Sequence, residues 1–146
     1  MLKITPVTEN NFSQAMAVYR ASWAQSHKEI CTPVFLETRD YAGYLLKRLD
    51  GLYLVEDRIP VGVFYLSGEE FADLYIRPDC QGRGYGKEAI RFAVSRCNEL
   101  RLTVLSSNMA AIGLYEKMGF RFTGVDKALQ NGLQEREMRY MEKHNG

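Results

Sequence analysis

The most informative segment of the chain reads Gln81-Gly82-Arg83-Gly84-Tyr85-Gly86, and it lies between the apolar run Leu74-Tyr75-Ile76 and a helical pattern. Three glycines within five positions let backbone N–H groups approach a ligand closely. The helix that follows presents free N–H donors and the positive end of its dipole. A strand, a glycine loop and a helix in this order favour a seat for a phosphate group.

Two common phosphate loops do not fit this segment. A P-loop needs Ser or Thr after its lysine, whereas Glu88 follows Lys87. A dinucleotide-binding loop reads G-x-G-x-x-G early in a parallel unit, but this loop reads G-x-G-x-G in mid-chain. Glycine makes up 12 of the 146 residues, so a short glycine pattern in a structural turn also arises by chance. The rest of the chain has to decide between a phosphate seat and a turn.

The composition predicts one globular domain over residues 1–146, long enough to bury a core. A net charge of +1 offers no broad basic surface for nucleic acid. No apolar run has transmembrane length, and the N-terminus lacks the apolar core of a signal peptide. We therefore expect a cytoplasmic protein without a membrane or nucleic-acid partner.

The cysteines and histidines indicate no metal site. Cys31, Cys80 and Cys97 are odd in number and scattered, which is typical of reduced thiols. The chain contains two histidines, His27 and His144, so neither a His-rich metal centre nor a Ser-His-Asp hydrolase is expected.

Apolar periodicity predicts seven strands and four helices in the order β-α-α-β-β-β-α-β-α-β-β. The strands are expected at 3–7, 51–56, 61–66, 69–76, 101–105, 120–123 and 134–141. The helices are expected at about 10–25, 32–49, 84–97 and 108–118. Asn10 or Asn11 would cap the first helix, Thr32 and Pro33 would begin the second, and Gly119 would end the last. This order indicates an α/β protein with a mixed sheet and helices on both faces.

Two segments resemble the signatures of the GNAT family of acyl-CoA-dependent N-acetyltransferases. The first runs from Asp73 to Gly86 and matches the family's central strand and pyrophosphate loop. The second runs from Ser107 to Phe120 and includes Tyr115. The two motifs lie about 25 residues apart. The resemblance implies a single domain with a central, mostly antiparallel sheet of about seven strands. It also implies about four flanking helices and a splayed pair of strands.

The resemblance implies acetyl-CoA as the acyl donor. Backbone groups of Leu74, Tyr75 and Ile76 at the splay would pair with the pantetheine arm, as an added strand does. The pyrophosphate would be held at Gln81, Gly82, Arg83, Gly84, Tyr85, Gly86 and Lys87. The charges of Arg83 and Lys87 would either strengthen this grip or lie on a solvated face. Asn108 has two compatible roles: it would cap its helix, and it would bind the pantetheine or position a water.

Acetyl transfer to an amine requires a neutral amine, an oxyanion donor and a proton for the departing thiolate. A lysine-like amine has a pKa of about 10.4, so roughly 1 in 2500 is neutral at pH 7 and deprotonation costs about 4.6 kcal/mol. A backbone N–H between Leu74 and Ile76 would stabilise the oxyanion. The resemblance implies Tyr115 as the acid that protonates the thiolate. Its helical spacing with Ile112 and Met118 also fits a core tyrosine.

Glu70 is the leading candidate for the base, because some branches of the family carry a glutamate at the corresponding place. Strand alternation predicts that Glu70 shares a face with Leu74 and Ile76. Glu69 and Asp73 are competing carboxylates, and the pair Glu69-Glu70 also fits an exposed turn. Loss of the proton through a water chain, without a dedicated base, is a further alternative.

The leading hypothesis is an N-acetyltransferase that moves an acetyl group directly to a primary amine of a small molecule or peptide. A covalent acyl-cysteine is disfavoured, because neither Cys80 nor Cys97 has a histidine nearby in the sequence. A non-catalytic acyl-CoA sensor is the alternative, and a nucleotide-binding protein is a weaker one. Homodimers are common in the family, so a homodimer agrees with the resemblance. Candidate acceptor-site residues are Trp23, His27, Phe35, Tyr41, Tyr44 and the turn Asn131-Gly132.

Overall fold

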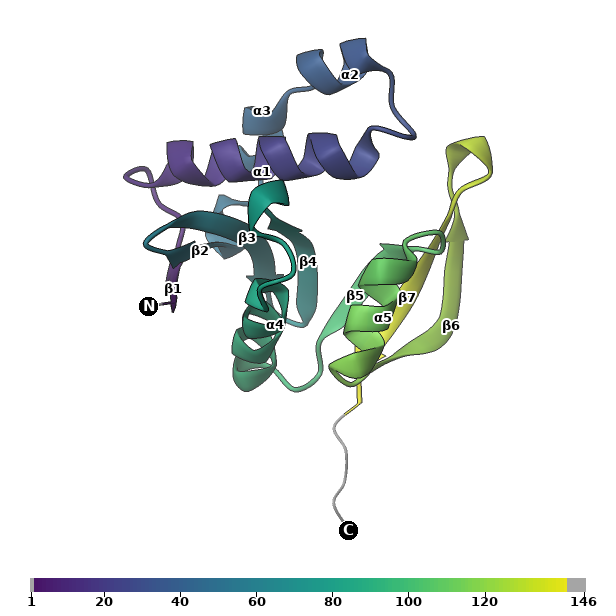
Figure 1. Ribbon diagram of the computed structural model, residues 1–146. Coiled ribbons are helices and arrows are strands. Elements are labelled where there is room, and N and C mark those ends of the chain that lie inside the picture. The colour runs from purple at the N-terminus through teal and green to yellow at the C-terminus, as the bar shows by residue number, and fades with distance from the viewer. Residues whose placement is uncertain (1, 142–146) are drawn as a thin grey trace.

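The structure, a computed structural model, describes residues 2–141 and contains a seven-stranded sheet with helices on both faces (Figure 1). The strands are β1 (Leu2–Pro6), β2 (Leu52–Asp57), β3 (Ile59–Ser67), β4 (Glu70–Ile76), β5 (Arg101–Leu105), β6 (Phe120–Ala128) and β7 (Gln134–Tyr140). The helices are α1 (Phe12–His27), α2 (Pro33–Thr38), α3 (Tyr41–Leu46), α4 (Tyr85–Arg96) and α5 (Met109–Lys117). The predicted α/β class and the sequence of strands are confirmed.

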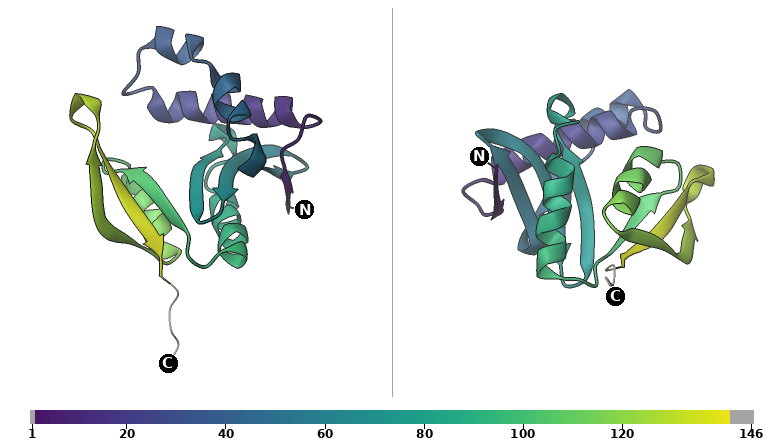
Figure 2. Two further views of the ribbon diagram at one scale, coloured as in Figure 1. Left: turned by 180° about the vertical axis from the view of Figure 1, so that it is seen from behind. Right: turned by 60° about the horizontal axis from the view of Figure 1, so that its bottom comes forward.

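The sheet parts in its middle. Its strand order is β1-β2-β3-β4-β5-β7-β6, and β4 and β5 are its parallel neighbours. These two strands meet in register at Glu70 and Arg101, where β4 and β5 both begin. Farther along they diverge, so that β5, β7 and β6 stand apart from β1 to β4 (Figures 1 and 2). The predicted splayed pair is therefore confirmed.

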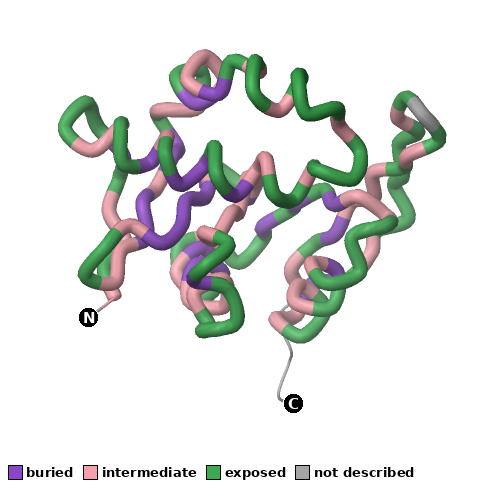
Figure 3. Tube along the Cα trace, turned by 45° about the horizontal axis from the view of Figure 1, so that its top comes forward, coloured by how far each residue is buried: buried purple, intermediate pink, exposed green. Residues whose placement is uncertain are grey.

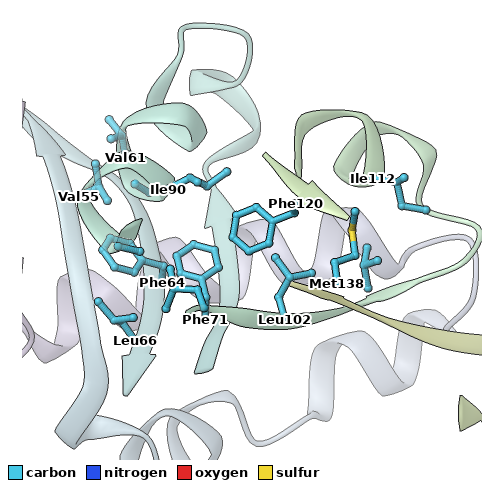
Figure 4. Close-up of a cluster of buried hydrophobic side chains, with 14 of the residues drawn as sticks. Val55, Val61, Phe64, Leu66, Phe71, Ile90, Leu102, Ile112, Phe120 and Met138 are labelled. Carbon is cyan, nitrogen blue, oxygen red and sulfur yellow. The ribbon is translucent and has the colours of Figure 1, made fainter. Parts of the chain in front are cut away.

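Two apolar clusters hold the helices on opposite faces of the sheet. The larger cluster packs α4 and α5 against strands of both halves, with Phe64, Phe71 and Phe120 fully buried at its centre (Figure 4). The smaller cluster packs α1 and α3 on the other face, around the buried Tyr19 and Leu45. Figure 3 shows the buried trace beneath α1, whereas α2 has no buried residue. The larger cluster thus joins the two halves of the sheet where their backbones separate.

The predicted second helix consists of two short helices. Thr32 caps α2 as expected, because its Oγ1 accepts a hydrogen bond from the N–H of Phe35 at 3.2 Å. The helix ends at Thr38, since Arg39 adopts an extended ψ of 140°. Asp40 then caps α3 through the N–H of Gly43 at 2.9 Å. The described residues therefore contain five α-helices, one more than predicted.

Of two other predicted helix ends, the asparagine cap of α1 is wrong and the glycine stop after α5 is confirmed. Asn11 lies at the N-cap of α1, but its Oδ1 accepts from the N–H of Thr8 at 2.7 Å and bonds no helical N–H. Gly119, with φ 104°, follows α5 as the predicted stop. Within residues 2–141, no helix has the length and apolar character needed to cross a membrane.

Candidate functional site

The glycine loop between β4 and α4 exposes backbone N–H groups. Gly82 and Gly84 have φ of 79° and 86°, in the left-handed region that glycine adopts readily. Gly84 is the N-cap of α4, so the first N–H groups of this helix have no carbonyl partner within it. A Cβ built on either glycine would meet nothing within 4 Å, so the protein leaves their surroundings open. The loop has the donors and the space that a phosphate group requires.

Three elements converge beside this loop at Gly86. A Cβ on Gly86 would lie 3.3 Å from Leu114 Cδ2 of α5 and 3.9 Å from Leu74 Cδ2 of β4. A side chain at this position would therefore require Leu114 to shift by a few tenths of an ångström. The first turn of α4, the parting strand β4 and α5 thus border one region of the molecule.

The side chains of the loop have separate tasks. Gln81 Nε2 donates to the Ile76 carbonyl at 3.2 Å and to Gln25 Oε1 at 3.4 Å, which ties the loop to β4 and α1. The Tyr85 hydroxyl donates to Asp57 Oδ2 at 2.6 Å, so this side chain points toward β2. Arg83 is exposed and Lys87 is partly buried. Neither forms an ion pair within the described part of the chain.

A β-bulge at Asp73 changes the alternation of β4. Asp73 has φ 54°, a left-handed conformation that costs a non-glycine residue about 1–2 kcal/mol. The register between β3 and β4 shifts between Val63 and Tyr65, opposite this residue. Because of this extra residue, the side-chain alternation after the bulge is shifted by one position from the alternation before it.

This bulge contradicts the predicted position of Glu70. Leu74 and Ile76 pack in the cluster under α4 and α5, as predicted for neighbours two apart. Glu70 lies on the opposite face, where it and Asp73 both approach Arg48. The alternation that put Glu70 beside Leu74 and Ile76 is wrong, because it assumed an unbroken strand.

The three candidate carboxylates have different environments. Glu69 forms an exposed ion pair with Arg101 at 3.1 Å, and the Glu70 side chain is 57% exposed, 3.8 Å from Arg48. The Asp73 side chain is 13% exposed and lies 3.3 Å from the Arg48 Nε. Burial raises the pKa of Asp73 above the ordinary aspartate value, although the Arg48 charge opposes the shift. Asp73 is thus the least exposed carboxylate of the three.

Tyr44 also holds Asp73. Its hydroxyl lies 3.1 Å and 3.0 Å from the two carboxylate oxygens and donates a hydrogen bond to them. Burial, together with the charge of Asp73, raises the pKa of Tyr44 to about 12. The phenol therefore remains a donor to Asp73 throughout the neutral pH range.

Tyr115 lies on α5 with its ring packed edge-on against Phe120, at a centroid distance of 5.8 Å. It belongs to the partly buried rim of the larger cluster, as a core tyrosine would. Burial first, and the negative charge of Asp73 second, raise the pKa of Tyr115 to about 12. The phenol is consequently protonated at neutral pH and lies within electrostatic reach of Asp73.

Asn108 caps α5, as one of its two predicted roles required. Its Oδ1 accepts a hydrogen bond from the N–H of Ala111 at 3.2 Å. The cap fixes where α5 begins and therefore where Tyr115 lies, about two turns later in the helix.

The predicted acceptor-site aromatics surround an arginine that the sequence did not single out. The Arg39 guanidinium lies 4.0 Å from the ring centroid of Trp23 and 5.1 Å from that of Tyr44, and it donates to the Tyr19 hydroxyl at 2.9 Å. His27 stacks on Trp23 at 3.7 Å, and its burial lowers its pKa. These rings pack against one another and against Arg39, so most of them support α1 and α3.

A cleft of about 430 Å³ opens beside this cluster. Its lining residues are Tyr44, Lys47, Arg48, Tyr65 and Glu70. The Arg48 guanidinium lies over the Tyr65 ring at 4.5 Å. Two of the lining residues, Tyr44 and Arg48, are the partners of Asp73.

The cysteines do not suggest a nucleophile. Cys80 is buried, and burial raises the pKa of its thiol, which disfavours the reactive thiolate. Across residues 2–141, His, Cys, Asp and Glu side chains form no group that could hold a metal ion.

Comparison with known proteins identifies the family. The model of the acetyltransferase (GNAT) family matches residues 8–120, the span that carries the parted strands, the glycine loop and Tyr115. The chain belongs to the GNAT acetyltransferase family. This GNAT protein is 30% identical over 125 residues to the peptidyl-lysine N-acetyltransferase YjaB of Salmonella typhimurium. The aligned residues make up 85% of this chain and 86% of the relative. The predicted family and the N-acetyltransferase class are confirmed.

Solved structures agree with this assignment. The solution structure of apo YjaB from Escherichia coli has a TM-score of 0.80 at 25% identity and covers 98% of this chain and 99% of its own. The PaiA N-acetyltransferase from Thermoplasma acidophilum, crystallised with coenzyme A, has a TM-score of 0.71 at 18% identity, covering 96% and 99%. The second likeness concerns the fold alone. It shows that a fold of this shape accommodates coenzyme A in another protein.

Proposed function

We propose that this GNAT protein transfers the acetyl group of acetyl-CoA to the side-chain amine of a lysine in a peptide or protein. The donor half of the proposal rests on one observation. The strands β4 and β5 part beyond Glu70 and Arg101, and the open end of β4 leads into the glycine loop at the start of α4. The acceptor half is supported by the similarity to YjaB, a peptidyl-lysine N-acetyltransferase.

The residues around the parting suit an acyl-CoA molecule. Backbone groups of Leu74, Tyr75 and Ile76 along the parted edge of β4 would pair with the amides of the pantetheine arm, and Gln81 would release the Ile76 carbonyl where the arm needs it. The N–H groups from Gly82 to Lys87 would hold the pyrophosphate at the positive end of α4. Arg83 and Lys87 would add charge-assisted contacts, since other described residues do not engage their charges in ion pairs.

Tyr115 is the proposed acid. A phenol whose pKa is raised to about 12 stays protonated at neutral pH and can give its proton to the sulfur as the thiolate departs. A backbone N–H of β4 between Leu74 and Ile76 would stabilise the oxyanion. The lysine amine must lose a proton before it attacks, and a carboxylate of β4 is suited to take it.

A thiol-release assay with acetyl-CoA tests the proposal, using a lysine-containing peptide, its acetyl-lysine analogue, and spermine as a small amine. Turnover with the lysine peptide, and an added acetyl group on the lysine by mass spectrometry, would support it. Turnover with spermine but not with peptides would move the acceptor to small amines. Tight acetyl-CoA binding without turnover of any amine would instead favour the acyl-CoA sensor.

A further inference from the structure

The bulge in β4 places Asp73 in an unusual backbone conformation. Asp73 adopts its left-handed conformation in the part of β4 that has separated from β5. Non-glycine residues seldom adopt this conformation unless their surroundings enforce it, and such residues concentrate at functional sites. Here the surroundings are Tyr44 and Arg48, which contact the Asp73 carboxylate on the face covered by α1 and α3.

Asp73 also interacts electrostatically with the proposed acid. Its charge contributes to the raised pKa of Tyr115 on α5 and to that of Tyr75 beside it on β4. Leu74, the neighbour of Asp73 on β4, and Tyr115 on α5 pack against the same apolar cluster beside the parting. Glu70, in contrast, lies at the closed end of the parting with its side chain largely in solvent.

The cleft gives an acceptor a route to this carboxylate. Tyr44 and Arg48 line the cleft and at the same time contact Asp73, so the two are adjacent. The Arg48 guanidinium lies 5.3 Å from the Tyr44 ring centroid and 4.5 Å from that of Tyr65, so an extended side chain such as lysine would approach Asp73 alongside Arg48 rather than between the rings. The Asp73 carboxylate, together with Glu70 in the lining of the cleft, suits the charged end of such a side chain.

We propose that Asp73, rather than Glu70, is the catalytic base, with Tyr44 and Arg48 as its positioning residues; this inference rests on the proposed function. The ammonium group of the lysine gives one proton to the Asp73 carboxylate, which later releases it to solvent. The neutral nitrogen then forms the C–N bond to the thioester carbon as the C–S bond breaks. Tyr115 gives its proton to the sulfur, and the second proton lost by the nitrogen restores Tyr115. The products are the acetylated lysine, coenzyme A and one proton.

The titration of Asp73 depends on several neighbouring groups. Those that influence it, or that its charge influences, are Arg39, Arg48, Glu70, Tyr19, Tyr44, Tyr75 and Tyr115. The phenols remain neutral near pH 7, so Arg39, Arg48 and Glu70 are the charged neighbours at that pH. A test of the base therefore needs a substrate change as well as a change in pH.

The test compares Asp73→Asn with the matched control Glu70→Gln, using the lysine peptide and an analogue with the more acidic amine of aminoethylcysteine. We expect Asp73→Asn to lower kcat at pH 7 by about 100-fold or more, with coenzyme A affinity within twofold of wild type. The defect should shrink as pH rises and with the more acidic amine, since more substrate then arrives neutral. Glu70→Gln alters the lining of the cleft, so it should raise the KM for the peptide, and any fall in its kcat should be the same at every pH and for both amines.

The reverse pattern, with Glu70→Gln defective and Asp73→Asn active, would overturn the assignment, as would two active variants. A defect in Asp73→Asn that is equal for both amines and at every pH would also overturn it, because a structural role predicts that result. If Asp73→Asn does not fold, Tyr44→Phe replaces it and should show the same dependence on pH and amine with a smaller defect. Inactive wild-type protein would instead overturn the proposed function itself.

Discussion

Glu70 of β4 and Arg101 of β5 meet in parallel register at the point from which their strands diverge. The N–H of Arg101 also donates to the Glu69 carbonyl at 2.7 Å, and the Glu69 and Arg101 side chains form an ion pair at 3.1 Å. These contacts fasten the two halves of the sheet at one end. The apolar cluster under α4 and α5 joins them on one face, so the other end remains parted without separating the halves.

Gly84→Asp should weaken coenzyme A binding about 100-fold, roughly 2.7 kcal/mol, because it adds a negative charge where the pyrophosphate is expected. Isothermal titration calorimetry measures this change. Gly124→Asp is the matched control, since Gly124 has φ 88° and a Cβ there also meets nothing within 4 Å. Both variants carry the same backbone strain, of about 1–2 kcal/mol. Equal affinity in the two variants would refute the loop assignment.

Tyr115→Phe should lower kcat by about 100-fold to 10,000-fold and leave coenzyme A affinity nearly unchanged, because the ring still packs against Phe120. Tyr140→Phe is the control, since Tyr140 also packs edge-on against Phe120, at 5.6 Å. Its kcat should equal that of wild type. If the two variants have equal rates, Tyr115 serves packing alone.

The pH profile of kcat offers a separate check on Tyr115. A phenol with a pKa of about 12 loses its proton only near that pH, so the acid remains competent throughout the range in which the protein can be assayed. We therefore expect no alkaline decline in kcat below about pH 10. A decline centred between pH 8 and 9 that is absent from Tyr115→Phe would show that the phenol titrates much lower than its burial implies.

Arg39→Ala should reduce the free energy of unfolding by about 2 kcal/mol, because it removes the cation between the rings and the hydrogen bond to Tyr19. Arg20→Ala serves as control. The exposed Arg20 lies over the Tyr41 ring at 5.4 Å, so its removal should cost less than about 0.5 kcal/mol. Urea denaturation measures both values, and similar losses would mean that the cluster does not depend on Arg39.

Because of Asp73, the free energy of unfolding should decrease as pH rises above about 4. The pKa of its carboxyl is raised in the folded state, so just above the ordinary aspartate value of about 3.9 the folded state binds more protons than the unfolded state. Stability from this group is present below that pH and is lost as pH rises through the folded pKa. The difference in unfolding free energy between wild type and Asp73→Asn should show this slope. If the stability of wild type relative to Asp73→Asn instead grows with pH, the Arg48 charge outweighs burial and lowers the pKa of Asp73.

Local signals in the sequence predicted much of the architecture. Thr32, Asn108 and Gly119 mark helix ends through bonds or dihedral angles of their own segments, and all three lie where expected. The cluster of glycines at 82–86 was equally visible in the sequence, and two of them adopt the left-handed conformation. The cofactor roles of these residues remain predictions.

Features that depend on distant partners were not predictable in this way. The apolar spacing of Tyr41, Tyr44 and Leu45 continues the pattern of α2, so the break at Arg39 and Asp40 was missed. That break accompanies the packing of Arg39 against aromatic rings of α1, more than ten residues away. The bulge at Asp73 likewise depends on register with β3 and on contacts with Tyr44, which a period-two pattern does not encode.

The parting of β4 and β5 also bears on aggregation. A divided sheet has two strand edges in its interior, and exposed edges readily pair with strands of other chains. Here the edges face a region bordered by α4 and α5, where a Cβ added to Gly86 would lie only 3.3 Å from Leu114 Cδ2. Such a border suits a slender, amide-bearing arm better than a second polypeptide strand. The arrangement that would select the acetyl donor therefore also shields the protein from pairing with copies of itself.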